Sequence, residues 1–135
     1  MTELTMISRY KIPRGKPRNA LPDGVRQDIR WRCSRHPLHS PEALVKEYLA
    51  APGDKAWQKF RKGYRAELTR RFRTDRAPFD DLAALARTQD VYLGCSCPTQ
   101  SNPRVDRCHT WVALEFMQEK YPDLVVRFPD HQPLD

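Results

Sequence analysis

The chain has 135 residues, which suits one domain with a single hydrophobic core. Its 39% of hydrophobic residues is low for a globular protein, but the 10% of aromatic residues and a clear helical periodicity argue against disorder. No apolar run is long enough to cross a bilayer. With 24 Lys and Arg against 17 Asp and Glu, the net charge of +7 favours partners such as nucleic acid or phosphorylated ligands. Residues Met1–Tyr10 lack the apolar segment of a signal peptide, so we expect a cytoplasmic protein with no membrane partner.

The first part of the chain differs in composition from the rest. Residues 1–24 are rich in proline, glycine and basic side chains, and we expect them to form an irregular, basic N-terminal arm. A short strand is expected within it, over Leu4–Ser8. Residues 25–128 then form a single α/β domain, and residues 129–135 form a polar tail.

Periodic apolar residues predict the first elements of the domain. Alternation predicts a strand over Val25–Trp31, and a short helix follows over Pro41–Ala51 with Ser40 as its N-cap. The clearest helix is Lys55–Phe72, because large apolar side chains recur along it at steps of three and four residues. The basic residues on this helix either contact phosphate groups or form a solvated face. They are Lys59, Arg61, Lys62, Arg65, Arg70, Arg71 and Arg73.

The second half of the domain continues the alternation of helices and strands. A helix is expected over Phe79–Arg87, then a buried strand over Val91–Cys95. Asp106 is expected to cap a helix over Arg107–Lys120, and Leu124–Phe128 reads as a final strand. Strands that alternate with helices predict a mostly parallel sheet covered by helices.

A cluster of cysteines follows the predicted strand Val91–Cys95. Cys95 and Cys97 lie two residues apart on an extended segment, so their side chains can point the same way. Cys108 is expected in the first turn of the next helix, where the helix dipole lowers a thiol pKa and attracts anions. Ligands of open parallel sheets bind at the carboxyl ends of the strands. We therefore expect a site at this sheet edge, with His109 beside Cys108.

Three interpretations of this cluster remain open. The first is a zinc site on Cys95, Cys97 and Cys108, because zinc prefers sulfur and nitrogen ligands. His109 is less suited to share that ion with Cys108, since neighbouring helical residues point about 100° apart. In the second, Cys108 is a low-pKa nucleophile and His109 is its acid or base. In the third, the cysteines are packing residues, which suits Cys95 beside Gly94 best.

Three segments together resemble a known family. Val25-Arg-Gln-Asp28-Ile-Arg30, followed by Ser34, has the form D-[VI]-R…S at a strand end. The helix from Trp57 to Leu68 has the form W-x-x-F-x-x-x-Y-x-x-E-L, and Val91–Cys95 is followed by Cys108-His109 at a helix start. In this order the segments resemble the YeaO-like family of unknown function, domain-of-unknown-function family four-eight-eight.

Two features depart from the family's pattern. Thr110 follows Cys-His where the family often has Arg, and Cys95-x-Cys97-Pro98 resembles the C-x-C-P…CH variant of another uncharacterised group. The resemblance implies a three-layer, Rossmann-like α/β fold with a pocket at the strand ends, and it implies no established activity. It also adds Asp28 and Arg30 as site candidates. Such a pair suits phosphate or base recognition and proton transfer, or forms an ordinary surface ion pair.

These observations lead to two main hypotheses of function, beside a third in which the chain is a partner-binding protein with packed, inert cysteines. The first is a nucleotide- or nucleic-acid-directed enzyme with a Cys/His site at the strand ends. The alternative is a non-enzymatic, basic nucleic-acid-binding module with a structural zinc on Cys95, Cys97 and Cys108. The catalytic candidates of the first hypothesis are Cys108, His109, Asp28 and Arg30. Its ligand-binding candidates are Cys97, Ser34 and Arg35.

Overall fold

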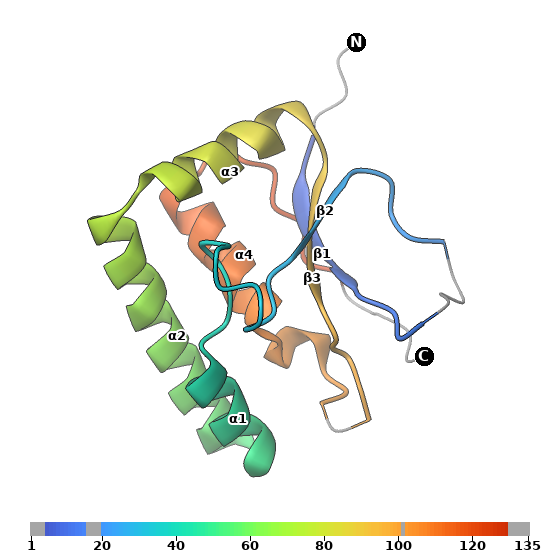
Figure 1. Ribbon diagram of the computed structural model, residues 1–135, viewed down its shortest axis with the longest axis vertical. Coiled ribbons are helices and arrows are strands. Elements are labelled where there is room, and N and C mark those ends of the chain that lie inside the picture. Colours follow the sequence, from blue (N-terminus) through green and yellow to red (C-terminus); the bar gives the residue numbers. More distant parts are fainter. Residues whose placement is uncertain (1–4, 16–19, 101, 130–135) are drawn as a thin grey trace.

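The computed structural model describes residues 5–15, 20–100 and 102–129. Within them, two strands are followed by three α-helices, a third strand and a fourth α-helix, so strands and helices do not alternate regularly as the sequence predicted (Figure 1). The expected polar tail, beyond residue 129, and parts of the expected arm, residues 1–4 and 16–19, lie outside the described residues. The strands are β1 (Ile7–Lys11), β2 (Val25–Asp28) and β3 (Val91–Cys95). The helices are α1 (Glu42–Ala50), α2 (Asp54–Thr74), α3 (Ala77–Thr88) and α4 (His109–Lys120), and a 3-10 turn, η1, spans Val105–Arg107.

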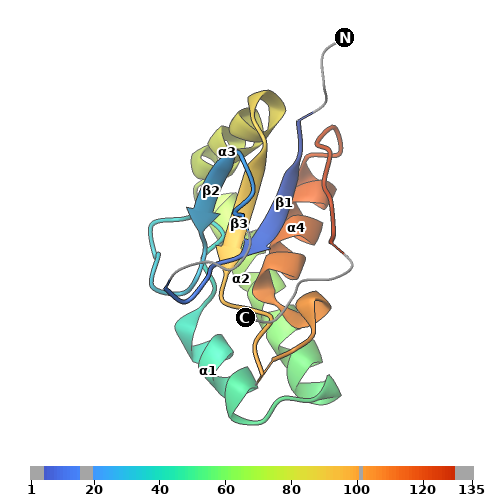
Figure 2. The same cartoon turned by 90° about the vertical axis from the view of Figure 1, so that its right-hand side faces the viewer.

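The sheet is parallel, with β3 between β1 and β2 (Figure 2). Ile7 and Val25 are both level with Val91, so the three strands start together and end at one edge. An isolated parallel bridge between Ile7 and Val126 continues the sheet beyond β1. The α/β class and the parallel sheet predicted from the sequence are confirmed.

The helices lie on one face of this sheet in both views (Figures 1 and 2). The described parts of the connection from β1 to β2 lie on the other face, where the expected three-layer fold would have helices. Gly94 allows Ile12, at the start of this connection, and the side chain of Tyr10 in β1 to approach β3, because a Cβ at Gly94 would lie 2.8 Å from side-chain atoms of both. In the described part of the chain, no helix has the length and apolar character that a membrane span requires.

The core fills the space between the sheet and the helices. Val91 and Leu93 alternate along β3 and are fully buried. The apolar stripe predicted for α2 is buried as well, and Phe79 and Phe116 of α3 and α4 pack with their ring centroids 5.7 Å apart. The stripe consists of Trp57, Phe60, Tyr64 and Leu68.

Several predicted boundaries are wrong near the ends of elements. The first strand is β1, Ile7–Lys11, so part of the segment expected to form an arm belongs to the sheet, where Ile7 is fully buried. β2 ends at Asp28, three residues early, because the Asp28 carboxylate accepts the backbone N–H of Arg30 and turns the chain. The expected last strand is reduced to its bridge at Val126.

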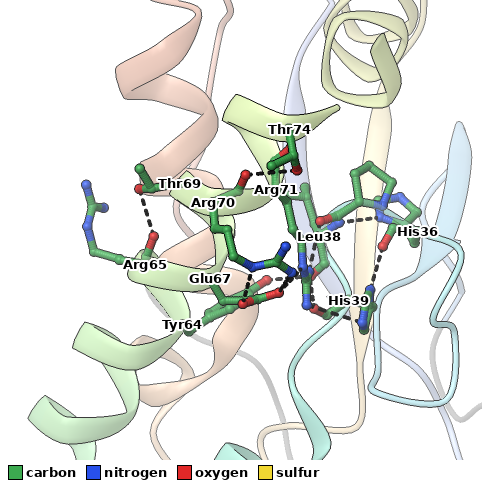
Figure 3. A network of polar contacts seen from close by, with 11 residues as sticks. His36, Leu38, His39, Tyr64, Arg65, Glu67, Thr69, Arg70, Arg71 and Thr74 are labelled. Carbon is green, nitrogen blue, oxygen red and sulfur yellow. Dashed lines mark hydrogen bonds and ion pairs between the residues drawn. The ribbon is translucent and has the colours of Figure 1, made fainter. Parts of the chain in front are cut away.

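The loop between β2 and α1 is fastened to α2 by a polar network (Figure 3). Arg71 donates from Nη1 to the carbonyls of Pro37, at 3.0 Å, and His39, at 2.8 Å. The buried Tyr64 hydroxyl donates to the carbonyl of Leu38. Ser40 is not the N-cap of α1, since the helix begins one residue later and Pro41 takes the cap position; the Ser40 N–H donates to the carbonyl of Ile29. This network holds the carboxyl end of β2 against the helices.

Candidate functional site

Three sulfur atoms meet at the carboxyl edge of the sheet. Cys95 ends β3, Cys97 lies in the loop that follows, and Cys108 precedes α4. Their Sγ atoms all lie within 4.8 Å of one another, and Cys95 and Cys108 are buried. The structure therefore brings together the three residues that the sequence named as candidate metal ligands.

Cys108 is the N-cap of α4 and not a residue of its first turn. Asp106 lies in a 3-10 turn over Val105–Arg107 that precedes Cys108, where it pairs with Arg104 at 2.7 Å and does not cap the helix. The predicted start of the helix at Arg107 was therefore two residues early. The N-terminus of α4, with its partial positive charge, still faces the sulfur atoms.

His109 is part of the same buried cluster. Its Nε2 lies 2.8 Å from the carbonyl oxygen of Ile29, which can only accept, so Nε2 carries the proton and donates. In the neutral ring this leaves Nδ1 as an acceptor, 3.5 Å from Sγ of Cys95 and 3.8 Å from Sγ of Cys108. The arrangement orients a base toward two thiols.

The thiols of the cluster differ in acidity. Burial raises the pKa of Cys108, but hydrogen bonds from Cys95 and Cys97 and the charge of His109 outweigh it, so this pKa lies well below its ordinary value. The pKa of Cys97 is raised by its hydrogen bonds to Cys108 and Cys95 and by burial. The pKa of Cys95 is also raised, first by its hydrogen bond to Cys108. Of the three thiols, Cys108 is therefore the one whose ionisation the cluster favours.

A buried arginine supports the cluster from β1. Arg9 is 2% exposed, and it donates from Nε to the Thr110 hydroxyl at 2.7 Å and from Nη2 to the carbonyl of Cys97 at 2.5 Å. Its Nη1 is buried and has no hydrogen-bond partner among the described residues. Sequence reasoning assigned Arg9 to the irregular, basic N-terminal arm. Its position two residues after the apolar Ile7, on the same face of a strand, was the available signal.

Asn102 is a second residue that sequence reasoning missed. It is buried, and its Nδ2 donates to Sγ of Cys97 at 3.2 Å and to the carbonyl of Arg107 at 3.0 Å. Its Oδ1 accepts from the hydroxyl of Tyr48 at 3.3 Å. One side chain thus connects the loop after β3 to α1, and Asn102 marked only a loop in the sequence.

A cavity of about 360 Å³ opens onto this cluster. Its lining comes from the segments that follow all three strands, and from α1 and α2. Cysteines and His109 form one part, arginines another, and aromatic rings of the helices a third. The aromatic residues are Trp31, Tyr48, Trp57 and Phe60. The arginines are Arg14, Arg30, Arg32 and Arg107.

A model of one protein family matches residues 11–121, which is most of the chain. Its description is DUF488-N3a, active DUF488-N3 subclade. The chain belongs to this DUF488 family. The resemblance to family four-eight-eight found in the sequence is thereby confirmed. A search of curated proteins and a search of solved structures each gave no match.

Asp28 and Arg30 of this DUF488 chain form an ion pair at the edge of the site. Arg30 Nη2 lies 2.6 Å from the Asp28 carboxylate, and Arg30 Nη1 donates to the Ser96 hydroxyl at 3.2 Å. Burial raises the pKa of Asp28, but the hydrogen bonds and charge of Arg30 outweigh it and hold the pKa below its ordinary value. Arg30 lines the cavity, whereas Ser34 and Arg35 are exposed and are not among its lining residues.

The basic residues of α2 are largely paired with acidic side chains. Five of the seven that the sequence offered as phosphate contacts have a carboxylate partner, so much of their charge is already matched. This favours a solvated helix face over a nucleic-acid surface at α2. The pairs are Lys59–Glu47, Arg61–Glu115, Arg65–Glu119, Arg70–Glu67 and Arg71–Glu67.

Proposed function

We propose that this DUF488 protein is a thiol-dependent enzyme acting on a nucleotide or nucleic-acid ligand, with Cys108 as its nucleophile. One observation carries the proposal: Cys108 lines the cavity while its Sγ lies 3.8 Å from Nδ1 of His109, whose Nε2 is engaged by the carbonyl of Ile29. A thiol is activated as a nucleophile when a base can take its proton and a third group orients that base. The description of the subclade as active agrees with an enzyme.

Each neighbour of Cys108 has a role in this proposal. His109 Nδ1 takes the proton of Cys108, and the two other thiols donate hydrogen bonds to the resulting thiolate. Arg30 meets the negative charge of the ligand at the cavity, and Asp28 positions Arg30 through its paired hydrogen bonds.

Alkylation mapped by mass spectrometry tests the proposal. Metal-free protein is treated with limiting iodoacetamide at pH 7, and the modified cysteines are identified over time. We expect Cys108 to react at least about tenfold faster than Cys33, which lies outside the cluster and has a raised pKa. His109→Asn should slow the reaction of Cys108 and leave that of Cys33 unchanged. Faster modification of Cys33 would contradict an activated Cys108.

The second candidate function is a nucleic-acid-binding module with a structural zinc. Three sulfurs within 4.8 Å of one another favour it, because zinc is held by such clusters of thiolates. His109 also has the arrangement common to metal-binding histidines, with one ring nitrogen donating to a carbonyl and the other facing the site.

Metal analysis separates the two candidates. One zinc per chain in protein purified without chelator, bound in wild type and in Cys33→Ser but lost in Cys97→Ser, would support the module. Protein without zinc whose cluster thiols are all open to alkylation would support the enzyme.

A further inference from the structure

Apart from the Cys108 thiol, the charged side chains that line the cavity are all arginines. Four arginines line it, and no aspartate or glutamate does. Arg30 and Arg107 are matched by Asp28 and Asp54 just outside the lining. Arg14 and Arg32 have no carboxylate partner in the described part of the chain. The lining therefore keeps an excess of positive charge, which calls for an anionic ligand.

Aromatic rings from the helices form a second part of the lining. Trp57 and Phe60 of α2 are stacked, with centroids 5.4 Å apart and planes at 19°, and Tyr48 of α1 meets Trp57 edge-on at 5.6 Å. Trp31 lines the cavity from the segment after β2, and the Arg32 guanidinium lies 5.3 Å from its ring centroid. Such surfaces bind a flat ring by stacking and by apolar contact.

The hydroxyl of Ser40, in the segment before α1, is a third part of the lining. A hydroxyl both donates and accepts hydrogen bonds, so it can bind a ring nitrogen or a carbonyl of a ligand in the cavity.

From these three features we infer that the cavity binds a free mononucleotide, with its base against the aromatic rings and its phosphate held by Arg14, Arg30 and Arg32. The volume of about 360 Å³ is near the lower end of small-molecule sites, which suits one nucleotide and not a longer strand. The inference deepens the proposed function, because this ligand would lie beside Cys108. Binding itself needs no reaction.

Tryptophan fluorescence measures this binding, since Trp31 and Trp57, two of the three tryptophans, line the cavity. AMP, GMP, CMP and UMP are titrated separately into the wild-type protein. We expect at least one to change the emission with saturation. The matching nucleoside and inorganic phosphate should each bind at least about tenfold more weakly, because each offers only one of the two contacts.

Matched variants test the assignment of the phosphate contact. Arg32→Gln, alone or with Arg14→Gln, should weaken the mononucleotide about tenfold and leave the nucleoside unaffected. Arg73→Gln, on α2 outside the cavity lining, is the control and should bind as wild type. Both arginines of the test are on the rim and exposed, so their replacement leaves the fold intact.

Three results would overturn the inference. They are the absence of binding by all four mononucleotides, equal binding of inorganic phosphate, and binding of a single-stranded oligonucleotide alone. Failure of the proposed function is a separate result, because it concerns the reactivity of Cys108 toward iodoacetamide. If the protein binds a mononucleotide but Cys108 is unreactive, the inferred binding site stands and the proposed thiol-dependent activity is contradicted.

Discussion

Arg9 of β1 donates a 2.7 Å hydrogen bond from Nε to the hydroxyl of Thr110 in α4, across 101 residues of sequence. Its Nη2 reaches the carbonyl of Cys97, in the loop after β3. One buried guanidinium thus connects the three segments that surround the sulfur cluster. Thr110, which directly follows Cys108 and His109 in the sequence, is the residue in α4 that receives the guanidinium of Arg9.

Replacing Arg9 should therefore destabilise the protein. Arg9→Met keeps most of the side-chain length but leaves the buried Thr110 hydroxyl and Cys97 carbonyl without their charged donor. We expect a loss of about 3 kcal/mol in the free energy of unfolding, measured in urea. Arg65→Met, which removes an exposed ion pair on α2, is the control and should cost less than about 1 kcal/mol. Equal effects of the two variants would show that Arg9 is no more than a surface residue.

The close approach at Gly94 gives a second prediction. In Gly94→Ala, the new methyl group would meet Ile12 and Tyr10 at 2.8 Å, so the connection from β1 to β2 must shift. We expect a cost of about 1–3 kcal/mol in urea unfolding, typical of overpacking. Gly53→Ala is the matched control, because a Cβ there meets no atom within 4 Å. An Ala at Gly94 as harmless as one at Gly53 would contradict the close packing.

Acid should weaken the loop network through His36. Burial, with the charge of His39, lowers the pKa of His36 from 6.5 to about 4, and its Nδ1 accepts the N–H of Leu38 at 3.1 Å. Above pH 6.5 the ring is neutral in both states. As the pH falls from 6.5 to about 4, the unfolded chain binds a proton that the folded chain does not, so stability falls.

The size of this loss follows from the pKa difference. It amounts to about 3 kcal/mol by pH 4, and below that pH His36 adds nothing further. Urea midpoints at pH 7, 5.5 and 4.5 measure the slope for the wild type and for His36→Asn, whose amide oxygen can still accept from Leu38. The variant should lose most of the slope. A slope that survives the substitution would assign the acid sensitivity to other groups.

Binding to polyanions should depend on the cavity rim more than on α2. Arg14 and Arg32 have no carboxylate partner among the described residues, whereas Arg61 and Arg65 are paired with Glu115 and Glu119. The salt concentration that elutes the protein from heparin should fall more for Arg14→Gln with Arg32→Gln than for Arg61→Gln with Arg65→Gln. A larger fall for the Arg61 and Arg65 variant would indicate that polyanions bind to α2 instead.

The parts of the fold that were predictable are those with local signals. β3 was predicted with its observed bounds, Val91–Cys95, because a buried parallel strand is a short apolar run. The central helix was predicted to within two residues, since its apolar stripe has the period of a helix. The predicted strand Leu4–Ser8 was displaced by three residues from β1, because Arg9 and Lys11 were assigned to the irregular, basic arm. Burial of Arg9 depends on partners at Cys97 and Thr110, which lie far along the chain.

In the candidate site, too, the features with a local signal in the sequence were predictable and the long-range contacts were not. The spacing of Cys95 and Cys97 on an extended segment indicated convergence, and the sulfur atoms do converge with that of Cys108. The engagement of His109 by the carbonyl of Ile29 has no local signal, because it joins residues 80 positions apart. The aromatic rings of the cavity were read as core, and Trp57 belongs both to the core and to the cavity lining.

The order of the strands also determines when the molecule can assemble during synthesis. β1 and β2 both pair with β3 and not with each other, and β3 begins at Val91, far downstream of the end of β2 at Asp28. Pairing between such distant segments closes large loops and slows folding. The two outer strands therefore leave the ribosome without a partner, and the sheet forms only after residue Cys95 has emerged. The sulfur cluster needs α4 as well, so the site is among the last parts of the nascent chain to take shape.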